Sequence, residues 1–285
     1  MFRKSTIQLL RFHFSFFLLP IYLFAISQPT VIDWRKATLV FLILHLLVYP
    51  SSNGYNSYMD RDDTPIGGLK HPMKPTKELF YTTIVMDVLA VFLSLLAGPV
   101  FTVCILLYIL ASRAYSYRRI RLKKYPIPGF LTVFIFQGAL IFFAVFHAVQ
   151  NGSLSGTPVF PCIVSSMLIG ALYPLTQIYQ HEEDKKDGVI SISYLLGKKG
   201  TFVFSMLLFL AATFLMYLRF KEVNQLNHFY WYLLIMFPVV LFFLYWMKKV
   251  WENGEAANFS NSLSMNILST ICTTAFFIIL IISKH

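Results

Sequence analysis

Apolar residues fill long stretches of this chain, and polar residues gather in the short segments between them. An apolar stretch of about 20 residues has the length of a helix that crosses a bilayer. Nine such stretches can be placed, at residues 12–28, 37–59, 78–98, 99–117, 130–150, 159–181, 201–218, 229–247 and 263–283. The pattern therefore predicts an all-α, polytopic membrane protein with nine transmembrane helices. We expect residues 1–285 to form a single transmembrane domain, because the spans leave no room for a separate soluble one.

The overall composition agrees with this prediction. Hydrophobic residues make up 57% of the chain and charged residues 13%, and the mean hydropathy is +0.64. These values are typical of membrane proteins rather than of soluble globular domains. Cys104, Cys162 and Cys272 lie in or at the ends of spans without metal-ligand spacing, which favours a packing role.

The basic residues predict how the bundle is oriented. When the 24 Lys and Arg are assigned to alternate sides of the nine spans, 19 lie on the side of the N-terminus and 5 on the other. This asymmetry predicts an integral, multi-pass membrane protein with a cytoplasmic N-terminus and an outside C-terminus, in the bacterial inner membrane. We expect the net charge of +11 to be concentrated at the cytoplasmic end of the bundle, where it faces anionic membrane lipids or an anionic substrate. Nucleic acid is not an expected partner, because the charge is scattered over membrane loops.

One segment of the chain occurs twice, at residues 49–63 and again 124 residues later at 173–187. Tyr49, Pro50, Tyr55, Asn56, Asp60 and Asp63 of the first copy recur as Tyr173, Pro174, Tyr179, Gln180, Asp184 and Asp187. Both copies fall at the cytoplasmic ends of spans that run in the same direction. The chain therefore contains a parallel internal repeat, in which spans two and six are equivalent.

Helical spacing places the repeated polar residues on one face of each span. The steps of three and four residues form two stripes: His45, Tyr49, Ser52, Asn56, Asp60 and Asp63 on span two, and Tyr173, Gln177, Gln180, Asp184 and Asp187 on span six. Polar stripes inside membrane helices usually face a cavity or each other. Pro50 and Pro174 each remove a backbone hydrogen bond, so we expect both helices to kink.

The two acidic clusters could hold divalent cations between them. Carboxylate and amide oxygens suit Mg²⁺, which is often completed by substrate phosphates. A set of basic residues lies near by in the sequence: Lys70, Lys74, Arg118, Arg119, Arg121, Lys123, Lys185 and Lys186. One acidic cluster alone would usually be a solvated loop charge, but the same pattern repeated at equivalent depth favours a site. The acids and bases together suit a diphosphate, and the apolar bundle suits a long hydrocarbon tail.

These motifs resemble those of the UbiA superfamily of intramembrane prenyltransferases, whose signatures are N-D-x-x-D-x-x-x-D after the second helix and D-x-x-x-D after the sixth. Here residues 56–63 read N-S-Y-M-D-R-D-D, and residues 180–188 read Q-H-E-E-D-K-K-D-G. The following V-I-S-I-S-Y-L-L-G, the Tyr115-Ser116 pair with Arg121 and Lys123, and the loop 65–72 also resemble family segments. In that loop, Lys70 takes the place of an arginine.

The resemblance implies an enzyme that transfers an isoprenyl group from an isoprenyl diphosphate to an aromatic, quinone-precursor or other lipophilic acceptor, with Mg²⁺ as cofactor. It assigns the metal to Asp60, Asp63, Asp184 and Asp187. It gives catalytic roles to Asp60, Asp184, Lys70, Arg121 and Lys123, of which the three cations would stabilise the leaving diphosphate. Asn56, Gln180, Tyr49, Tyr115, Tyr173 and Tyr179 are the expected substrate-binding residues.

Some positions depart from the family pattern. Ser57 replaces the second-position aspartate, Thr64 stands where a later one is expected, and Gln180 replaces the leading acid of the second motif. One alternative is therefore a divergent, non-catalytic family member. Another is a multipass transporter, although transporters place substrate groups near the midplane, whereas these acids lie at the rim. Asp87, deep in span three, either contacts the acceptor or makes a buried structural hydrogen bond.

Overall fold

The nine-span prediction is confirmed by the computed structural model, which describes residues 3–150, 156 and 158–284. Within that part of the chain, nine helices are long and apolar enough to cross a membrane. Four of them are α5 (Lys77–Ala97), α6 (Pro99–Ser116), α9 (Val159–Gln177) and α11 (Ile192–Glu222), and α12 (Leu226–Glu252) and α13 (Phe259–Lys284) follow. The other three spans, Lys4–Ile26, Trp34–Asp60 and Pro126–Val149, are each built from several shorter elements.

These three composite spans contain local departures from α-helical geometry. The first consists of α1 (Lys4–Leu10), the 3₁₀-helix η1 (Phe12–Leu18) and α2 (Leu19–Ile26). The second consists of α3 (Trp34–Leu42), the π-helix η2 (Ile43–Val48) and α4 (Tyr49–Asp60). The third consists of α7 (Pro126–Val133), the π-helix η4 (Phe134–Ala139) and α8 (Leu140–Val149). Because a proline ring clashes with the carbonyl four residues before it, the π-helix η2 falls where Pro50 requires an adjustment.

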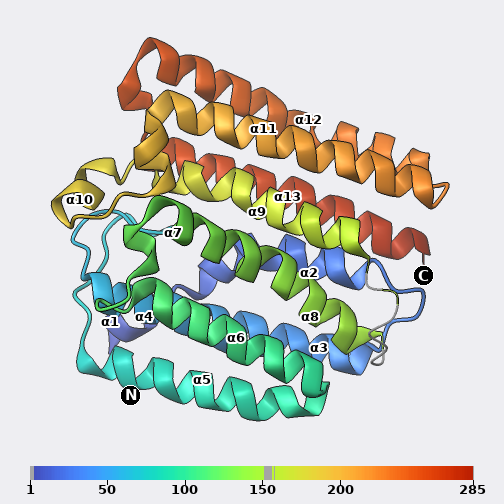
Figure 1. Ribbon diagram of the computed structural model, residues 1–285, viewed down its shortest axis with the longest axis horizontal. Coiled ribbons are helices and arrows are strands. Elements are labelled where there is room, and N and C mark those ends of the chain that lie inside the picture. The colour runs from blue at the N-terminus through green and yellow to red at the C-terminus, as the bar shows by residue number, and fades with distance from the viewer. Residues whose placement is uncertain (1–2, 151–155, 157, 285) are drawn as a thin grey trace.

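The spans pack side by side in one bundle (Figure 1), with α11 and α12 along one edge and α5 along the opposite edge. At one end of the bundle lie α1, α10 (His181–Lys186) and the adjoining ends of α4 and α7. Close helix contacts support the middle: a Cβ atom on Gly138 would come within 2.4 Å of the Cα of Ser166. Span five therefore approaches span six through a glycine, as small residues allow in membrane bundles.

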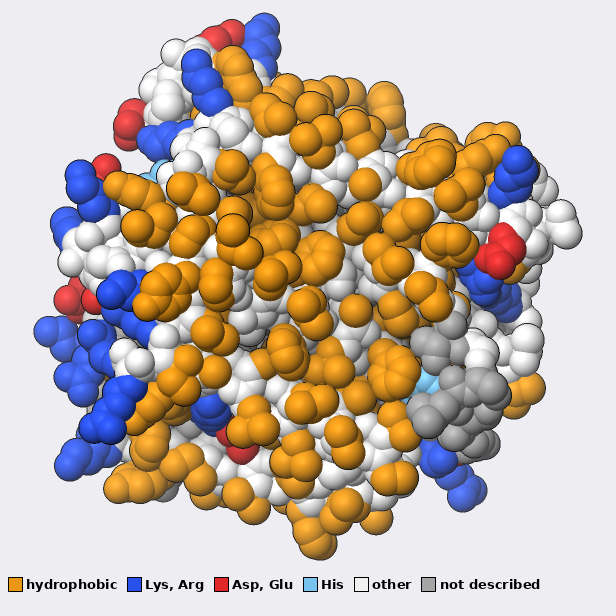
Figure 2. Space-filling view, in the orientation of Figure 1, with side chains coloured by type: hydrophobic (Ala, Val, Ile, Leu, Met, Phe, Trp, Pro, Cys, Tyr) orange, Lys and Arg blue, Asp and Glu red, His pale blue; other side chains and the backbone are white. Residues whose placement is uncertain are grey.

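Apolar side chains cover the middle of the molecule, and Lys and Arg side chains gather mainly at one end (Figure 2). That end carries the loops after α4, α6 and α9, and it holds most of the basic residues of the chain. The distribution is that of a membrane-spanning bundle with an apolar long side and a basic end.

Both copies of the repeat lie at this basic end, but each helix stops before the last residues of its predicted polar stripe. Helix α4 ends at Asp60, because Arg61 adopts a left-handed conformation with φ of 58°. Helix α9 ends at Gln177, three residues after Pro174, whose missing N–H removes the helical bond to the carbonyl of Gly170. The prediction of two unbroken stripes is therefore wrong beyond Asp60 and Gln177. Asp63 leaves the helix face of α4, and the acids of the second copy lie on or next to the separate helix α10.

Asp87 forms a half-buried ion pair between spans, outside the cavity described below. Its carboxylate pairs with Arg113 of α6 and accepts a hydrogen bond of 2.6 Å from the Ser51 hydroxyl of α4. The Arg113 guanidinium also lies 3.9 Å from the ring centroid of Tyr55. Of the two alternatives for Asp87, the structure supports the structural bond. The pair joins α4, α5 and α6 within the membrane region.

Candidate active site

A cavity of about 230 Å³ lies between the two copies of the repeat. Four carboxylates line it: Asp60 and Asp62 from the first copy, and Glu183 and Asp184 from the second. The cations Arg11 and Lys123 and the predicted substrate-binding residues Asn56, Tyr115, Tyr173, Tyr179 and Gln180 also line it. The structure thus brings together, around one space, residues more than a hundred positions apart in the chain.

Asp60 is the most heavily contacted of these acids. It is buried at the end of α4, where Asn56, one turn earlier, donates a hydrogen bond of 2.8 Å from Nδ2 to Oδ2. Lys123 forms an ion pair with the same oxygen, and a guanidinium nitrogen of Arg121 lies 3.6 Å from Oδ1. Oδ1 is buried and has no hydrogen-bond partner among the described residues. This oxygen therefore has an ion-pair contact with Arg121 but no hydrogen bond within the described part of the chain.

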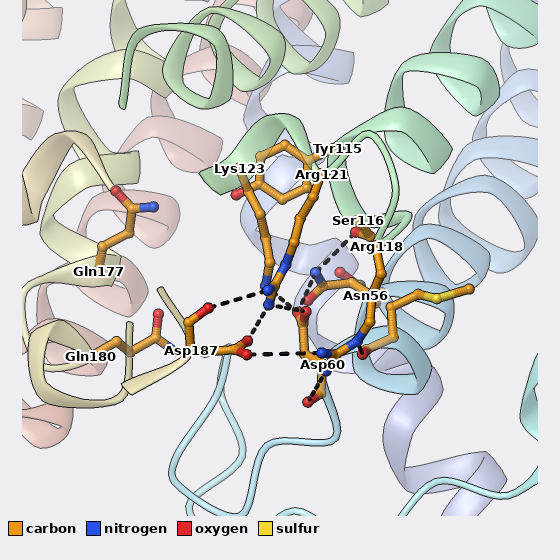
Figure 3. Close-up of polar contacts among 12 residues, drawn as sticks. Asn56, Asp60, Tyr115, Ser116, Arg118, Arg121, Lys123, Gln177, Gln180 and Asp187 are labelled. Atoms are coloured by element: carbon orange, nitrogen blue, oxygen red, sulfur yellow. Dashed lines mark hydrogen bonds and ion pairs between the residues drawn. The ribbon is translucent and has the colours of Figure 1, made fainter. Parts of the chain in front are cut away.

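The segment after α6 connects the two copies through its basic residues. Arg121 adopts a left-handed conformation with φ of 45° and begins the 3₁₀-helix η3 (Leu122–Lys124). Figure 3 shows Arg121 and Lys123 extending side by side between Asp60 and Asp187. Arg121 pairs with Asp187 of the second copy, while Arg118 lies 3.9 Å from the same carboxylate. These cations hold the acidic ends of both copies close together.

Helix α6 also joins the polar stripes of the two copies inside the bundle. On the side of α4, the Ser112 hydroxyl lies 2.7 Å from that of Ser52, and the Ser116 hydroxyl accepts a bond of 3.0 Å from Asn56. On the side of α9, the Tyr115 and Tyr173 hydroxyls are 2.5 Å apart. The amide of Gln177 donates to Tyr173 over 2.8 Å. The polar residues of α6 therefore fix the spacing of the cavity walls.

Arg11 is a cavity residue that the sequence reasoning missed. It interrupts the first span with a left-handed φ of 48°, is buried, and donates a bond of 3.0 Å to the backbone carbonyl of Asn53. The loop after α4 lies directly against it, because a Cβ atom on Gly67 would come within 2.2 Å of Arg11 Nη1. The sequence prediction began span one at residue 12 and so counted Arg11 as a rim charge. An arginine within the apolar run 7–26 was the available signal.

The acids on the cavity wall differ in part from those predicted to bind metal. Asp62 lines the cavity, whereas Asp63 is exposed, since the chain turns at Arg61. Burial, followed by the negative charge of Asp60, raises the pKa of Asp62 to about 6. Burial likewise raises the pKa of Asp184 to about 6, against the opposing effect of Lys123. In both carboxylates the effect of burial exceeds that of the nearby cations.

Four other predicted site residues lie outside the cavity wall, one of which is Arg121, described above. Tyr49 is buried, with its ring centroid 5.9 Å from that of Tyr108, and Tyr108 is the one that faces the cavity. Lys70 is exposed on the loop after α4. Asp187 is exposed and contacts the site through Arg121. Their roles stay predictions.

Among the residues that the structure describes, no group of three or more His, Cys, Asp or Glu side chains is arranged to hold a metal ion. The acids instead flank the cavity. A divalent cation bound here would need ligands from a second molecule in the cavity, as Mg²⁺ commonly obtains from phosphates.

Comparison with known proteins gives a consistent result. A sequence model of the UbiA prenyltransferase family matches residues 15–270. A UbiA homolog from Archaeoglobus fulgidus bound to GPP and Mg²⁺ superposes with a TM-score of 0.70 at 19% identity, over 98% of this chain and 99% of that one. The apo structure of a UbiA homolog from Aeropyrum pernix K1 superposes with a TM-score of 0.69 at 18% identity, over 94% and 97%.

A third structure, described as that of a digeranylgeranylglyceryl phosphate synthase, gives a TM-score of 0.63 at 22% identity over 98% of both chains. At these identities the structures show a shared fold. A search of curated proteins finds no match.

Proposed function

This chain belongs to the UbiA prenyltransferase family, and we propose that it transfers an isoprenyl group from an isoprenyl diphosphate to a lipophilic acceptor within the membrane. One observation carries the proposal: both copies of the acidic repeat line a single cavity that is also lined by two cations, the buried Arg11 and the half-buried Lys123. A transporter would be expected to have its substrate-binding groups near the membrane midplane, not at the basic end of the bundle. The arrangement fits an enzyme that binds a diphosphate at this end and a hydrocarbon chain deeper in the bundle.

We propose Mg²⁺ as the cofactor because the donor atoms fit it. The cavity offers hard carboxylate oxygens, one of which, Asp60 Oδ1, is buried without a hydrogen bond. The raised pKa values of Asp62 and Asp184 indicate acids that a cation would stabilise in their charged form. Asp60, Asp62 and Asp184 are the residues that would hold the ion. Bound beside a diphosphate, it supplies neutralisation of the leaving group's charge.

The cations of the site are placed to bind the diphosphate oxygens. Arg11 lies between α1 and η1, and Lys123 lies in η3 after α6, so the two cations line the cavity from segments far apart in the chain. Their fixed positive charges would stabilise the negative charge that develops on the diphosphate as it leaves. Arg121 already binds Asp60 and Asp187, so we assign it to positioning the two acidic clusters.

The deeper wall suits the hydrocarbon part of the donor and an acceptor. Aromatic and aliphatic residues line it, namely Phe14, Phe17, Leu18, Phe136, Ile169 and Leu172. Such a wall excludes water from a carbocation, and aromatic faces stabilise positive charge. The hydrogen-bonded Tyr115 and Tyr173 line the same cavity, and we propose that they contact the reacting part of the substrates. We propose an aromatic, quinone-precursor or other lipophilic acceptor.

The direct test is a search for product. Purified protein is incubated with radiolabelled geranylgeranyl diphosphate, Mg²⁺ and a total lipid extract, and the lipids are then analysed by chromatography and mass spectrometry. We expect label to appear in a new lipid with Mg²⁺ and not with a chelator, and mass spectrometry to identify the acceptor. Label that stays in the donor under all conditions, with prenyl diphosphates of several lengths, would contradict the proposal.

We further propose that the site faces the cytoplasm. The 19-to-5 division of basic residues supports this orientation, because positive residues are retained on the cytoplasmic side. Reporter fusions at residues 65, 120 and 190, in the loops around the cavity, should then all report a cytoplasmic location. An outside location for any of the three would refute the orientation while leaving the bundle itself intact.

A further inference from the structure

A second cavity, of about 330 Å³, opens at the end of the bundle opposite the candidate active site. It lies among the C-terminal ends of α2, α11 and α13. Residues 28–30, which follow α2, form one side of it. Helix α11 runs from one end of the bundle to the other, as Figure 1 shows. The second cavity therefore lies at the other membrane surface.

Two cations from different helices line this cavity. Lys284 of α13 donates a hydrogen bond of 2.8 Å from Nζ to the backbone carbonyl of Ser27. Arg219 of α11 pairs at 2.9 Å with Glu222, which lies outside the cavity wall and is exposed. Among the described lining residues there is no Asp or Glu, whereas the amides of Gln28 and Gln225 are present. The wall thus combines positive charge with polar groups and offers no internal carboxylate.

The concentration of charge here is unusual for this end of the protein. Only 5 of the 24 basic residues lie at this end, and Arg219, Lys221 and Lys284 are three of them. Two positive groups beside one partly enclosed space repel each other. An anion in the space would remove that repulsion and accept hydrogen bonds from both side chains.

The rest of the wall is apolar. Phe24, Met216, Phe220 and Val223 line the side that adjoins the membrane-spanning helices. A ligand with a phosphate at one end and hydrocarbon at the other fits this combination. We propose that this cavity binds the phosphate of an anionic phospholipid from the leaflet opposite the active site. Free inorganic phosphate shares the anionic part of this chemistry and lacks the hydrocarbon.

The test measures binding of phosphatidylglycerol to detergent-purified protein by native mass spectrometry, with phosphatidylcholine as the comparison lipid. The double variant Arg219→Gln/Lys284→Gln should bind phosphatidylglycerol at least about tenfold more weakly than wild type, because both charge-assisted contacts are lost. The matched control for each single cavity variant, Arg219→Gln or Lys284→Gln, is Lys221→Gln, which likewise removes one positive charge but from an exposed position two residues from Arg219. It should bind like wild type, and Arg219→Lys, which keeps the charge, should retain most of the binding.

Two results would overturn the proposal. One is equal loss in the control and in the cavity variants, which would mean that only the general surface charge matters. The other is displacement of phosphatidylglycerol by millimolar inorganic phosphate, which would assign the cavity to a free anion. If the double variant does not fold, the single variants Arg219→Gln and Lys284→Gln decide between these outcomes. None of these variants touches the acidic cavity, so the result is independent of the proposed prenyl transfer.

Discussion

Asp60→Asn and Asp184→Asn should each lower kcat/KM for prenyl transfer by about 10²–10³-fold, the range found when one charge-stabilising group is removed from an active site. Both carboxylates line the same cavity from opposite copies of the repeat. Asn nearly preserves side-chain volume, so packing should survive, while the negative charge that a divalent cation requires is lost. Steady-state kinetics on purified protein, with folding checked by thermal unfolding, measures the effect.

The double variant distinguishes a shared site from two separate ones. Residues that act as a unit are strongly non-additive in mutant kinetics, so Asp60→Asn/Asp184→Asn should be little worse than either single variant. Glu182→Gln is the matched control, because Glu182 is exposed and absent from the cavity wall. It should retain nearly full activity. Full turnover by folded Asp184→Asn would mean that the second copy plays no part in catalysis.

Arg11→Gln and Lys123→Gln should each lower kcat/KM by about 10²-fold, since each removes a fixed positive charge that faces the diphosphate. Lys123 pairs with Asp60, and Arg11 is buried where the loop after α4 crosses it. The same kinetic assay measures both effects.

Lys124→Gln is the control for the two cation variants, because Lys124 is adjacent to Lys123 but exposed. Its activity should stay close to that of wild type. If Arg11→Gln folds and turns over normally, the role assigned to Arg11 is wrong, and its buried charge serves only the packing of the loop.

The main features of the fold could be predicted from the sequence because they depend on long-range composition and on periodicity. Nine apolar stretches predicted nine spans, and the structure has them in the described residues. The repeat also predicted that the polar faces of spans two and six would meet. Asp60 and Asp184 do line one cavity, since helical spacing determines which residues share a face.

The helix ends and the identity of the cavity residues depend on local backbone geometry, which the periodicity of the sequence does not predict. Arg11, Arg61 and Arg121 adopt left-handed conformations without being glycine, and such positions carry no clear sequence signal. Arg61 ends α4 and directs Asp62, rather than Asp63, toward the cavity. Arg11 breaks the first span and enters the site. The hydrogen bonds from α6 to both stripes depend on which helices are neighbours in the bundle. The spacing of residues within a single span does not predict this.

The central claim is that the two acidic clusters and a divalent cation together bind an isoprenyl diphosphate in the cavity between the repeats. Calorimetry with the unreactive analogue geranylgeranyl thiodiphosphate tests it most directly, in Mg²⁺ and in chelator. We predict binding at least about tenfold tighter with Mg²⁺ in wild type, and little effect of Mg²⁺ in Asp60→Asn. Equal affinity in Mg²⁺ and in chelator for the wild-type protein would contradict the claim.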